Sequence, residues 1–442
     1  MRLNDLATGK TGLIGFGRES RALESQVLAR MPQARLEVIA EQSPEIRPQQ
    51  WPLHIQSLSA ANLDFDRILR SPGVPVDHPA LLDARKRGIE ITTTSSLWFA
   101  ERPQARSIVI TGSKGKSTTT ALITHLLESA GQSVAMAGNI GIPLIGLLEH
   151  QADWFVIEMS SYQLVDLQAL PEIGVITRLF PEHVDWHGSL ENYYAAKLRL
   201  MDLLDGRPLW INAIDALLSD ATHGYTGLKF GNASDHIRSQ ADGVYAGNER
   251  LLCAGDWPLI GKHNLDNLAL AISVVASLGF DAAELAQAAH SFKPLPHRLQ
   301  QLTDAVGRRW INDSISTTPY ATQAALDCCG DDVVLLVGGL DRPADWQTLI
   351  RHRKRAAKDP FAGIVTLPDN GVQIADALIT AGLVDQHRVV HAQCMSEAVV
   401  AASRLAGLNT QIVLSPGAPS FPHYQNFEDR GDQFMRAVQA LA

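Results

Sequence analysis

The stretch that decides the fold is Thr111-Gly112-Ser113-Lys114-Gly115-Lys116-Ser117-Thr118. An apolar run at 107–110 precedes it, and apolar residues recur at helical spacing over 122–130 until Gly131. Strand, glycine turn, Gly-Lys-Ser and helix is the order of a phosphate-binding loop, whose backbone N–H groups and helix N-terminus hold phosphate oxygens. We expect Lys116 to reach the β- and γ-phosphates and the Ser117 hydroxyl to bind Mg²⁺. The alternative is a glycine-rich turn capped by Ser117, and the flanking strand and helix argue against it.

Length and composition limit the class of protein. The 442 residues exceed what one hydrophobic core usually holds, so we expect two or three domains. The formal net charge of −9 argues against a nucleic-acid partner, although basic residues gathered in a cleft could still hold an anionic substrate. We find no signal-peptide pattern and no apolar run long enough to span a bilayer, so no membrane partner is expected. Four scattered cysteines favour a reducing, cytoplasmic location over a disulfide framework or a zinc site.

Strand and helix patterns alternate in three blocks, which predicts doubly wound, mainly parallel sheets in three α/β domains. The predicted domains are 1–104, 105–297 and 298–442: a Rossmann-like domain, a central P-loop ATPase-type domain and a second Rossmann-like domain. The expected strands are Thr11–Gly15, Leu36–Ala40, Arg67–Leu69, Ser107–Thr111, Val134–Ala137, Trp154–Ile157, Gly174–Thr177, Val333–Val337, Ile364–Leu367 and Ile412–Leu414. Proline-rich and polar breaks at 102–106 and 293–298 separate the blocks.

A glycine turn follows the first predicted strand. Its sequence is Gly15-Phe16-Gly17-Arg18-Glu19-Ser20, which approximates G-x-G-x-x-G with a serine at the third glycine position. An anion could bind at the following helix N-terminus with Arg18 nearby. A purely structural tight turn fits the same residues equally well.

The central block carries three further groups of candidate residues. Glu158 ends a buried strand in the sheet of the phosphate loop, where a carboxylate commonly faces the metal of the nucleotide; a helix N-terminal carboxylate is the alternative. Residues 182–188 hold two histidines and two carboxylates, a pattern that suits metal ligation or plain surface polarity. Lys197 follows a small apolar pair, and periodicity alone favours a solvated helix lysine. Asn264 is a plausible helix N-cap, which would leave Asn267 on the first turn, able to contact a base.

In the third block, polar turns follow predicted strands at 312–319, 338–342 and 415–420. Open α/β sheets bind their ligands at the carboxyl ends of strands. We therefore expect these turns to line a ligand site.

Taken together, these residues resemble the Mur ligase family, the ATP-dependent enzymes that build the peptidoglycan stem peptide. The shortened phosphate loop, with Ile110 where the usual first glycine would be, is that family's form. Further matches run in order along nearly the whole chain: Gly138–Gly141, Glu158–Leu164, the His183 loop, Ala195–Lys197, His263-Asn264 with Asn267, His297-Arg298, Asn312–Ser314 and 414–431. The resemblance is strongest to the branch that adds glutamate to UDP-N-acetylmuramoyl-L-alanine.

The resemblance implies a mechanism and a set of roles. The alanine carboxylate would attack the γ-phosphate of ATP, and the glutamate amine would then attack the acyl phosphate. Catalytic roles would fall to Lys116, Glu158, His183 and Lys197, and two Mg²⁺ sites to Ser117, Glu158, His183 and a carbamylated Lys197. ATP would contact Gly112, Ser113, Lys114, Gly115, Lys116, Ser117, Thr118, Asn267, Arg298 and Asp313. UDP-muramoyl-alanine would contact Gly15, Phe16, Gly17, Arg18, Glu19, Ser20, Asn139 and Ser160.

The departures from the family pattern lie around the amino-acid substrate. Ile315 stands where the D-glutamate-adding enzyme has a lysine, and Arg342 replaces a second lysine. Losing an ammonium removes a charge-assisted contact to a carboxylate, and a guanidinium would hold the carboxylates differently. This combination resembles the less common branch that adds L-glutamate, whose product a separate epimerase inverts; D-glutamate is the alternative. Glutamate would contact Thr317, Arg342, Ser420 and Tyr424.

Three other classes are weaker alternatives. A folylpolyglutamate synthetase shares the phosphate loop but lacks a separate uridine-binding domain. An ATP-dependent switch protein would have no use for a carbamate on Lys197. A dinucleotide-dependent oxidoreductase would depend only on the imperfect turn at 15–20. No exposed apolar helix face is predicted, which favours a monomer.

Overall fold

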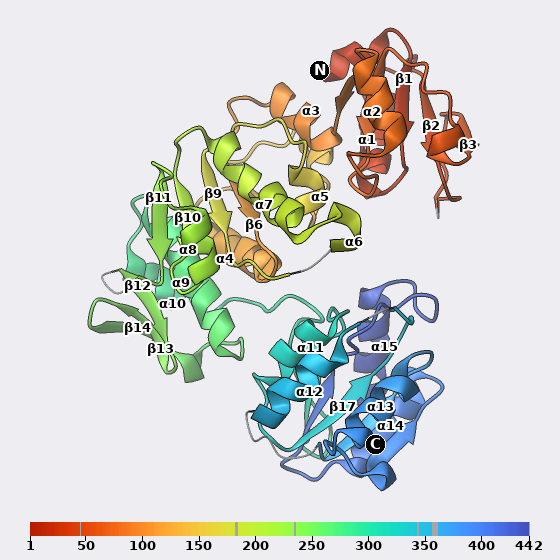
Figure 1. Cartoon of the computed structure of the whole chain (residues 1–442). Coiled ribbons are helices and arrows are strands. Elements are labelled where there is room, and N and C mark those ends of the chain that lie inside the picture. The colour runs from red at the N-terminus through yellow and green to blue at the C-terminus, as the bar shows by residue number, and fades with distance from the viewer. Residues whose placement is uncertain (45, 182–183, 234–235, 343, 356–360, 442) are drawn as a thin grey trace. The chain divides into compact units, whose positions relative to one another are not determined.

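The computed structural model describes residues 1–442 except 45, 182–183, 234–235, 343, 356–360 and 442. The chain forms two compact units, one of residues 1–257 and 263–292, the other of residues 258–262 and 293–442. Figure 1 shows the elements in chain order. Among the described residues, no helix is both long and apolar enough to cross a membrane.

The first unit begins with a five-stranded parallel sheet. Its strands are β1 (Thr11–Ile14), β2 (Leu36–Ala40), β3 (Leu53–Ile55), β4 (Arg67–Arg70) and β5 (Glu90–Thr92). Their order is β3-β2-β1-β4-β5. The chain therefore builds β1 to β3 toward one edge of the sheet and then returns past β1 to add β4 and β5 toward the other edge. Ligands of doubly wound sheets bind at such a reversal point, beyond the carboxyl ends of the strands.

A six-stranded parallel sheet follows in the same unit. Its strands are β6 (Ser107–Thr111), β7 (Val134–Gly138), β8 (Trp154–Glu158), β9 (Ile173–Ile176), β10 (Leu209–Asn212) and β11 (Leu228–Gly231). Their order is β11-β10-β9-β6-β8-β7. All residues of β6, β8 and β9 are buried, as expected for a parallel sheet covered on both faces.

Helices and a small antiparallel sheet complete the first unit. The helices are η1 (Leu3–Ala7), α1 (Arg18–Arg30), η2 (Leu58–Ala60), α2 (Pro79–Lys86), α3 (Thr94–Glu101), α4 (Lys116–Ser129), η3 (Leu144–Leu147), α5 (Ser161–Leu164), α6 (Val184–His187), α7 (Leu190–Leu204), α8 (Ala216–Ala221), η4 (Ala254–Asp256), α9 (Lys262–Ala276) and α10 (Ala282–Ala289). The small sheet has strands β12 (Ile237–Gln240), β13 (Gly243–Ala246) and β14 (Glu249–Cys253). Figure 1 shows α5, α6 and α7 close together, and both α5 and α6 contact α7.

One hydrophobic cluster extends across the two large sheets of the first unit. It joins Leu13 of β1 to Val109 of β6, with Trp98 of α3 between them. The Trp98 ring packs edge-on against Phe155 of β8, with 4.9 Å between the ring centroids. Buried aromatic pairs of this kind contribute about 1 kcal/mol beyond area burial. The two sheets of this unit therefore share a core.

The second unit has a six-stranded sheet with one antiparallel edge strand. Its strands are β15 (Gln300–Thr303), β16 (Arg309–Asn312), β17 (Val333–Val337), β18 (Gly363–Thr366), β19 (Val389–His391) and β20 (Gln411–Leu414), in the order β15-β16-β20-β17-β18-β19. Its helices are α11 (Pro319–Leu326), α12 (Trp346–Arg355), α13 (Gly371–Thr380), η5 (Gln386–Arg388), α14 (Met395–Leu405) and α15 (Phe427–Gln439). Two buried clusters, around Leu335 and Leu336 of β17, cover the opposite faces of this sheet.

The predicted α/β architecture is confirmed, and every predicted strand is present to within one residue at each end. The sequence patterns missed β10, β11, β15 and β16, the short edge strands β3, β5 and β19 and the antiparallel sheet β12–β14, because strands of three to five residues carry little periodic signal. The predicted N-cap at Asn264 is wrong. Helix α9 already begins at Lys262, because Gly261 before it has a non-helical φ of 94°. The predicted boundaries at 104/105 and 297/298 stay predictions.

Candidate functional site

The phosphate loop connects β6 to α4, and two of its glycines have no room for a side chain. Gly112 has φ 140°, and a Cβ there would lie 2.1 Å from Oγ1 of Thr177. Gly115 has φ 88°, and a Cβ there would lie 2.7 Å from Oδ1 of Asn267. Only glycine combines these positive φ values with such close neighbours. The loop therefore presents bare backbone in front of α4, as a phosphate cradle requires.

Two residues of α7 reach the loop from the side. Lys197 is 2% exposed, and its Nζ donates a 2.8 Å hydrogen bond to the carbonyl oxygen of Gly112. The hydroxyl of Tyr193 lies 2.8 Å from Oγ of Ser113, and the Lys197 Nζ lies 4.7 Å from the Tyr193 ring centroid. The expectation from periodicity that Lys197 is solvated is wrong, because α7 packs this face against the loop. The resemblance, by contrast, predicted Lys197 as a carbamylated ligand of the second metal, and this stays a prediction.

The side chain of Lys116 folds back onto the phosphate loop. Its Nζ donates to the carbonyl oxygen of Ser113 at 3.0 Å. Ser117 is buried in the first turn of α4, where the predicted Mg²⁺ ligand belongs. The other residues predicted to contact phosphate, Ser113, Lys114 and Thr118, lie in the same loop and in the first turn of α4.

Glu158 lies at the end of β8, next to β6, in register with Ile110. Its side chain is 1% exposed, and Oε1 accepts a 2.8 Å hydrogen bond from Nδ2 of Asn139. The other oxygen, Oε2, is buried and has no hydrogen-bond partner in the described part of the chain. A buried carboxylate oxygen without a partner is costly unless a cation binds there. Glu158 therefore fits the predicted role of a Mg²⁺ ligand.

The predicted second metal site can be followed only in part. His183 lies outside the described residues. Among those described, no group of three or more His, Cys, Asp or Glu side chains could hold a metal ion. Nearby, Nε2 of His187 in α6 lies 2.9 Å from Oγ of Ser161 in α5.

A cavity of about 590 Å³ opens beyond the carboxyl ends of β1, β2 and β4. All six residues predicted at the glycine turn, Gly15, Phe16, Gly17, Arg18, Glu19 and Ser20, line it, together with Asn139. Arg18 also donates a 2.6 Å hydrogen bond to the carbonyl oxygen of Gly141. Ser160 does not line the cavity. It caps α5 through hydrogen bonds with Gln163, which does line it.

The sequence analysis missed one wall of this cavity. Residues 71–75, Ser-Pro-Gly-Val-Pro, follow β4 and line the cavity beside the glycine turn, where Ser71 Oγ donates a 2.9 Å hydrogen bond to the Gly15 carbonyl oxygen. The signal was present in the sequence, because a Ser-Pro-Gly turn directly after a predicted parallel strand marks the ligand edge of the sheet. Gln163 belongs to the stretch Glu158–Leu164 that matches the family, but no role was predicted for it.

In the second unit, Asp313 lies in the turn after β16. It accepts hydrogen bonds from Ser415 Oγ at 2.9 Å, from Ser316 Oγ and from the Leu299 backbone N–H. Burial raises the pKa of Asp313 to about 6, and these hydrogen bonds and the Arg298 charge oppose that rise. Arg298 and Asp313, both predicted to contact ATP, are thus near one another. Asn267 is buried in α9, in the first unit.

The residues predicted to bind glutamate lie on three loops at the carboxyl ends of β16, β17 and β20. These strands are neighbours in the order β16-β20-β17. Thr317 and Arg342 are exposed, whereas Ser420 and Tyr424 are buried, and burial raises the pKa of Tyr424. Ile315, the position that distinguishes the two glutamate branches, is half-buried in the first loop.

The sequence analysis gave no role to the residue that joins these loops, Arg430 of α15. It is fully buried and donates to the Ser314 carbonyl oxygen at 2.8 Å, to Ser314 Oγ at 3.0 Å and to the Ala418 carbonyl oxygen at 3.0 Å. Burial lowers the pKa of Arg430 to about 10. Among the described residues, no carboxylate forms a salt bridge with it. Arg430 therefore adds positive charge beneath the loops predicted to hold a dicarboxylate.

Comparisons with known proteins show which family the chain belongs to. Residues 110–275 match the Mur ligase middle domain. A UDP-N-acetylmuramoyl-L-alanine--L-glutamate ligase from Xanthomonas euvesicatoria is 39% identical over 457 residues, covering 99% of this chain and 96% of the relative. Proteins of the same name from Xylella fastidiosa and a Micromonospora species are 39% and 36% identical, covering 98% and 100% of this chain and 96% and 99% of theirs.

Solved structures share the fold at low sequence identity. A UDP-N-acetylmuramate-alanine ligase from Thermotoga maritima superposes with a TM-score of 0.60 at 18% identity, covering 97% of this chain and 99% of that one. A MurF ligase from Thermotoga maritima in complex with ADP also gives 0.60, at 14% identity, covering 99% and 96%. From the sequence relatives and the middle-domain match together, this chain belongs to the Mur ligase family.

Proposed function

We propose that this ligase joins L-glutamate to UDP-N-acetylmuramoyl-L-alanine and converts ATP to ADP and phosphate. One observation carries the proposal. Asn139 lines the 590 Å³ cavity and at the same time donates to Glu158, whose other oxygen is buried without a hydrogen-bond partner among the described residues, on the strand next to β6. A nucleotide-sugar substrate in the cavity would thus lie one side chain away from the residues that handle the triphosphate.

The proposed reaction has two steps. An oxygen of the substrate's alanine carboxylate attacks the γ-phosphorus of ATP, and ADP leaves. The glutamate amine then attacks the acyl carbon, loses a proton, and phosphate departs as the amide forms. Neither step requires a covalent enzyme intermediate, so the protein acts by positioning the reactants and stabilising charge.

The phosphate loop and its neighbours would serve these steps. Backbone N–H groups at the start of α4 would bind the phosphates, and Lys116 would exchange its contact with Ser113 for the β/γ-phosphates. Ser117 and Glu158 would hold Mg²⁺, which neutralises phosphoryl charge when bound. Lys197, in our proposal carbamylated, would supply a carboxylate ligand for a second Mg²⁺ together with His183.

The remaining assignments stay proposals that follow the predicted sites. Asn267, Arg298 and Asp313 would contact adenine, phosphate and ribose. Residues 15–20 would face the uridine diphosphate, and Asn139 and Ser160 the muramoyl-alanine portion. Thr317, Arg342, Ser420 and Tyr424 would hold glutamate. We place the enzyme in the cytoplasm as a monomer.

The choice of L-glutamate is supported by the name that the three sequence relatives share and by Ile315 and Arg342 in the predicted pocket. With an L-glutamyl product, a separate epimerase would have to invert that residue if a D-glutamyl peptide is needed. D-glutamate is the second candidate, since its addition would use the same phosphate chemistry.

The test supplies purified enzyme with ATP, Mg²⁺ and UDP-N-acetylmuramoyl-L-alanine, and adds each glutamate enantiomer separately. Phosphate release and the mass of the product are measured. We expect turnover with L-glutamate and little with D-glutamate. Turnover with D-glutamate alone would overturn the stereochemical assignment, and no turnover with either would overturn the proposed function.

A further inference from the structure

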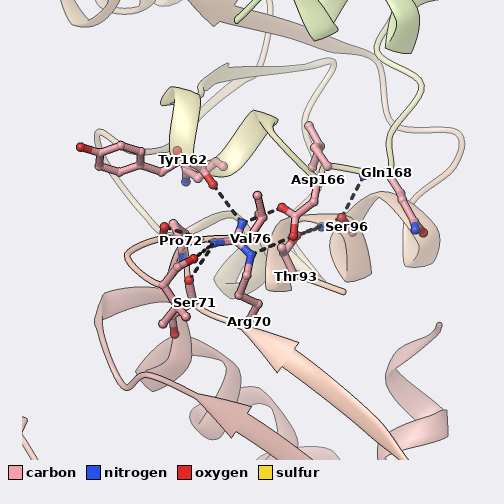
Figure 2. A network of polar contacts seen from close by, with 12 residues as sticks. Arg70, Ser71, Pro72, Val76, Thr93, Ser96, Tyr162, Asp166 and Gln168 are labelled. Carbon is pink, nitrogen blue, oxygen red and sulfur yellow. Dashed lines mark hydrogen bonds and ion pairs between the residues drawn. The ribbon is translucent and has the colours of Figure 1, made fainter. Parts of the chain in front are cut away.

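The most heavily hydrogen-bonded side chain near the cavity belongs to Arg70, the last residue of β4 (Figure 2). Its guanidinium is fully buried. Nε and Nη2 donate to the two carboxylate oxygens of Asp166 at 2.8 and 2.6 Å, in a bidentate pair. Nη2 also donates to the Tyr162 carbonyl oxygen at 3.0 Å. This edge of the guanidinium thus holds the segment around α5, which follows Glu158 by a few residues.

The other edge of Arg70 holds the cavity wall that follows β4. Nη1 donates to the carbonyl oxygens of Ser71, Pro72 and Val74, at 3.0, 3.2 and 2.6 Å. The indole N–H of Trp186 in α6 donates to the remaining carbonyl, that of Gly73, at 3.2 Å. The side chains of Arg70 and Trp186 therefore donate hydrogen bonds to all four carbonyl oxygens of residues 71–74.

Neither Arg70 nor Asp166 lines the cavity, although the segments they hold do so. Across the cavity, Gln163 of the same α5 segment donates to Oε1 of Glu19 at 2.6 Å. The α5 segment is thus tied to both walls: to residues 71–74 through Arg70, and to the glycine turn through Glu19. The two walls touch directly where Ser71 Oγ donates to the Gly15 carbonyl oxygen, and the α5 segment adds a second link between them just after the strand that ends in Glu158.

We infer that Arg70 and Asp166 are positioning residues for the nucleotide-sugar substrate. They hold residues 71–74 in the shape that the substrate's uridine diphosphate end requires and keep that wall aligned with the α5 segment. The inference rests on the proposed function. A bidentate guanidinium–carboxylate pair suits this task because its two parallel hydrogen bonds fix orientation as well as distance.

A change in Arg70 or Asp166 should alter KM for the nucleotide-sugar substrate more than any other kinetic constant. Loosening residues 71–74 weakens contacts made with the nucleotide-sugar in the ground state and transition state alike, which raises KM for that substrate with little change in kcat. In the proposed arrangement ATP and glutamate lie away from this wall, so their KM values should stay the same.

The test uses Asp166→Asn, which keeps the shape but removes the charge, and Arg70→Lys, which keeps the charge but cannot make six hydrogen bonds. Glu172→Gln is the matched control, because Glu172 pairs side-on with Nε and Nη2 of Arg106 at 3.0–3.3 Å and lies outside the cavity lining. We measure kcat and the KM for each of the three substrates, binding of UDP by calorimetry, and the melting temperature.

We expect Asp166→Asn and Arg70→Lys to raise KM for UDP-N-acetylmuramoyl-L-alanine and the Kd for UDP about tenfold or more. The other two KM values and the control should stay within about twofold. Asp166→Glu, which keeps a carboxylate, should fall between wild type and Asp166→Asn. A lower melting temperature with unchanged KM and Kd, or an equal rise in all three KM values, would overturn the inference. A wild-type enzyme that neither binds UDP nor turns over would instead overturn the proposed function.

Discussion

The side-chain nitrogen of Lys197 lies 2.8 Å from the carbonyl oxygen of Gly112, and the lysine is buried against the phosphate loop. Eighty-five positions separate the two residues in the sequence. The contact places a lysine of α7 beside the loop that we propose binds ATP. Because a buried lysine next to a phosphate loop is costly to desolvate, we propose a catalytic use for Lys197.

Lys197→Ala should reduce kcat by about 100-fold or more, because the reaction loses a charged group beside the transferred phosphoryl group. Lys197→Arg should not restore it, since a guanidinium does not form a carbamate with CO₂. Steady-state kinetics give the loss, and ¹³C NMR of enzyme kept in ¹³C-bicarbonate should show a carbamate resonance that both variants lack. Wild-type kcat in Lys197→Arg would show that a cation at this position suffices.

Glu158→Gln should raise the Mg²⁺ concentration for half-maximal activity by about tenfold or more, because an amide oxygen is a weaker ligand than a carboxylate. The hydrogen bond from Asn139 to Oε1 can remain, so the melting temperature should be unchanged or higher once the buried charge is gone. A Mg²⁺ titration of activity and a thermal melt check both expectations. An unchanged Mg²⁺ requirement would remove Glu158 from the metal site.

Asp313 should make stability fall as pH rises. Its pKa is about 6 in the folded protein, against about 3.9 in an unfolded chain. Between these values the folded state binds more protons, so the free energy of unfolding decreases with pH over roughly pH 4–6, by about 3 kcal/mol in total. Asp313→Asn should remove this slope. Urea unfolding at several pH values gives the free energy of unfolding of wild type and variant. The difference between the two isolates Asp313, because the other carboxyl groups contribute equally to both proteins. Parallel stability curves for the two proteins would contradict the expectation.

Arg430→Met should destabilise the second unit by about 3 kcal/mol, since it leaves the Ser314 and Ala418 carbonyl oxygens without their donor. Arg430→Lys should be milder but still destabilising, because one ammonium cannot reach both loops with the geometry of a guanidinium. Chemical denaturation measures the free energy of unfolding, and Arg436 of the same helix α15 offers the matched substitution Arg436→Met. Equal stabilities for the two methionine variants would show that Arg430 does not hold the loops.

Arg342→Met should raise KM for L-glutamate about tenfold or more while leaving KM for ATP unchanged. Its guanidinium is exposed at the carboxyl end of β17, so its removal should disturb substrate binding more than folding. Arg351, an exposed cation of α12, provides the control Arg351→Met. If Arg342→Met binds L-glutamate as well as wild type does, the carboxylates are held by other residues.

The local features of this protein could be predicted from its sequence. The strand at 107–111, the glycines of the phosphate loop and the helix after it depend on apolar periodicity and on backbone angles that glycine alone tolerates, and these are properties of neighbouring residues. The same holds for the glycine turn at 15–20, which lines the cavity as expected. Side-chain burial was less predictable: Lys197 looked solvated from periodicity, although α7 is buried on that face.

The tertiary structure decided which distant residues meet. The sheet order β11-β10-β9-β6-β8-β7 places Glu158 next to the phosphate loop, and the packing of α7 brings Lys197 to Gly112. The same is true of Arg70, which ends β4 of the first sheet, and Asp166, which lies between β8 and β9 of the second; they meet because the two sheets of the first unit share a core. Periodicity and turn chemistry act over a few residues, whereas strand order and helix packing depend on the whole chain. The sequence therefore determined the phosphate loop and the family, and the fold determined what surrounds them.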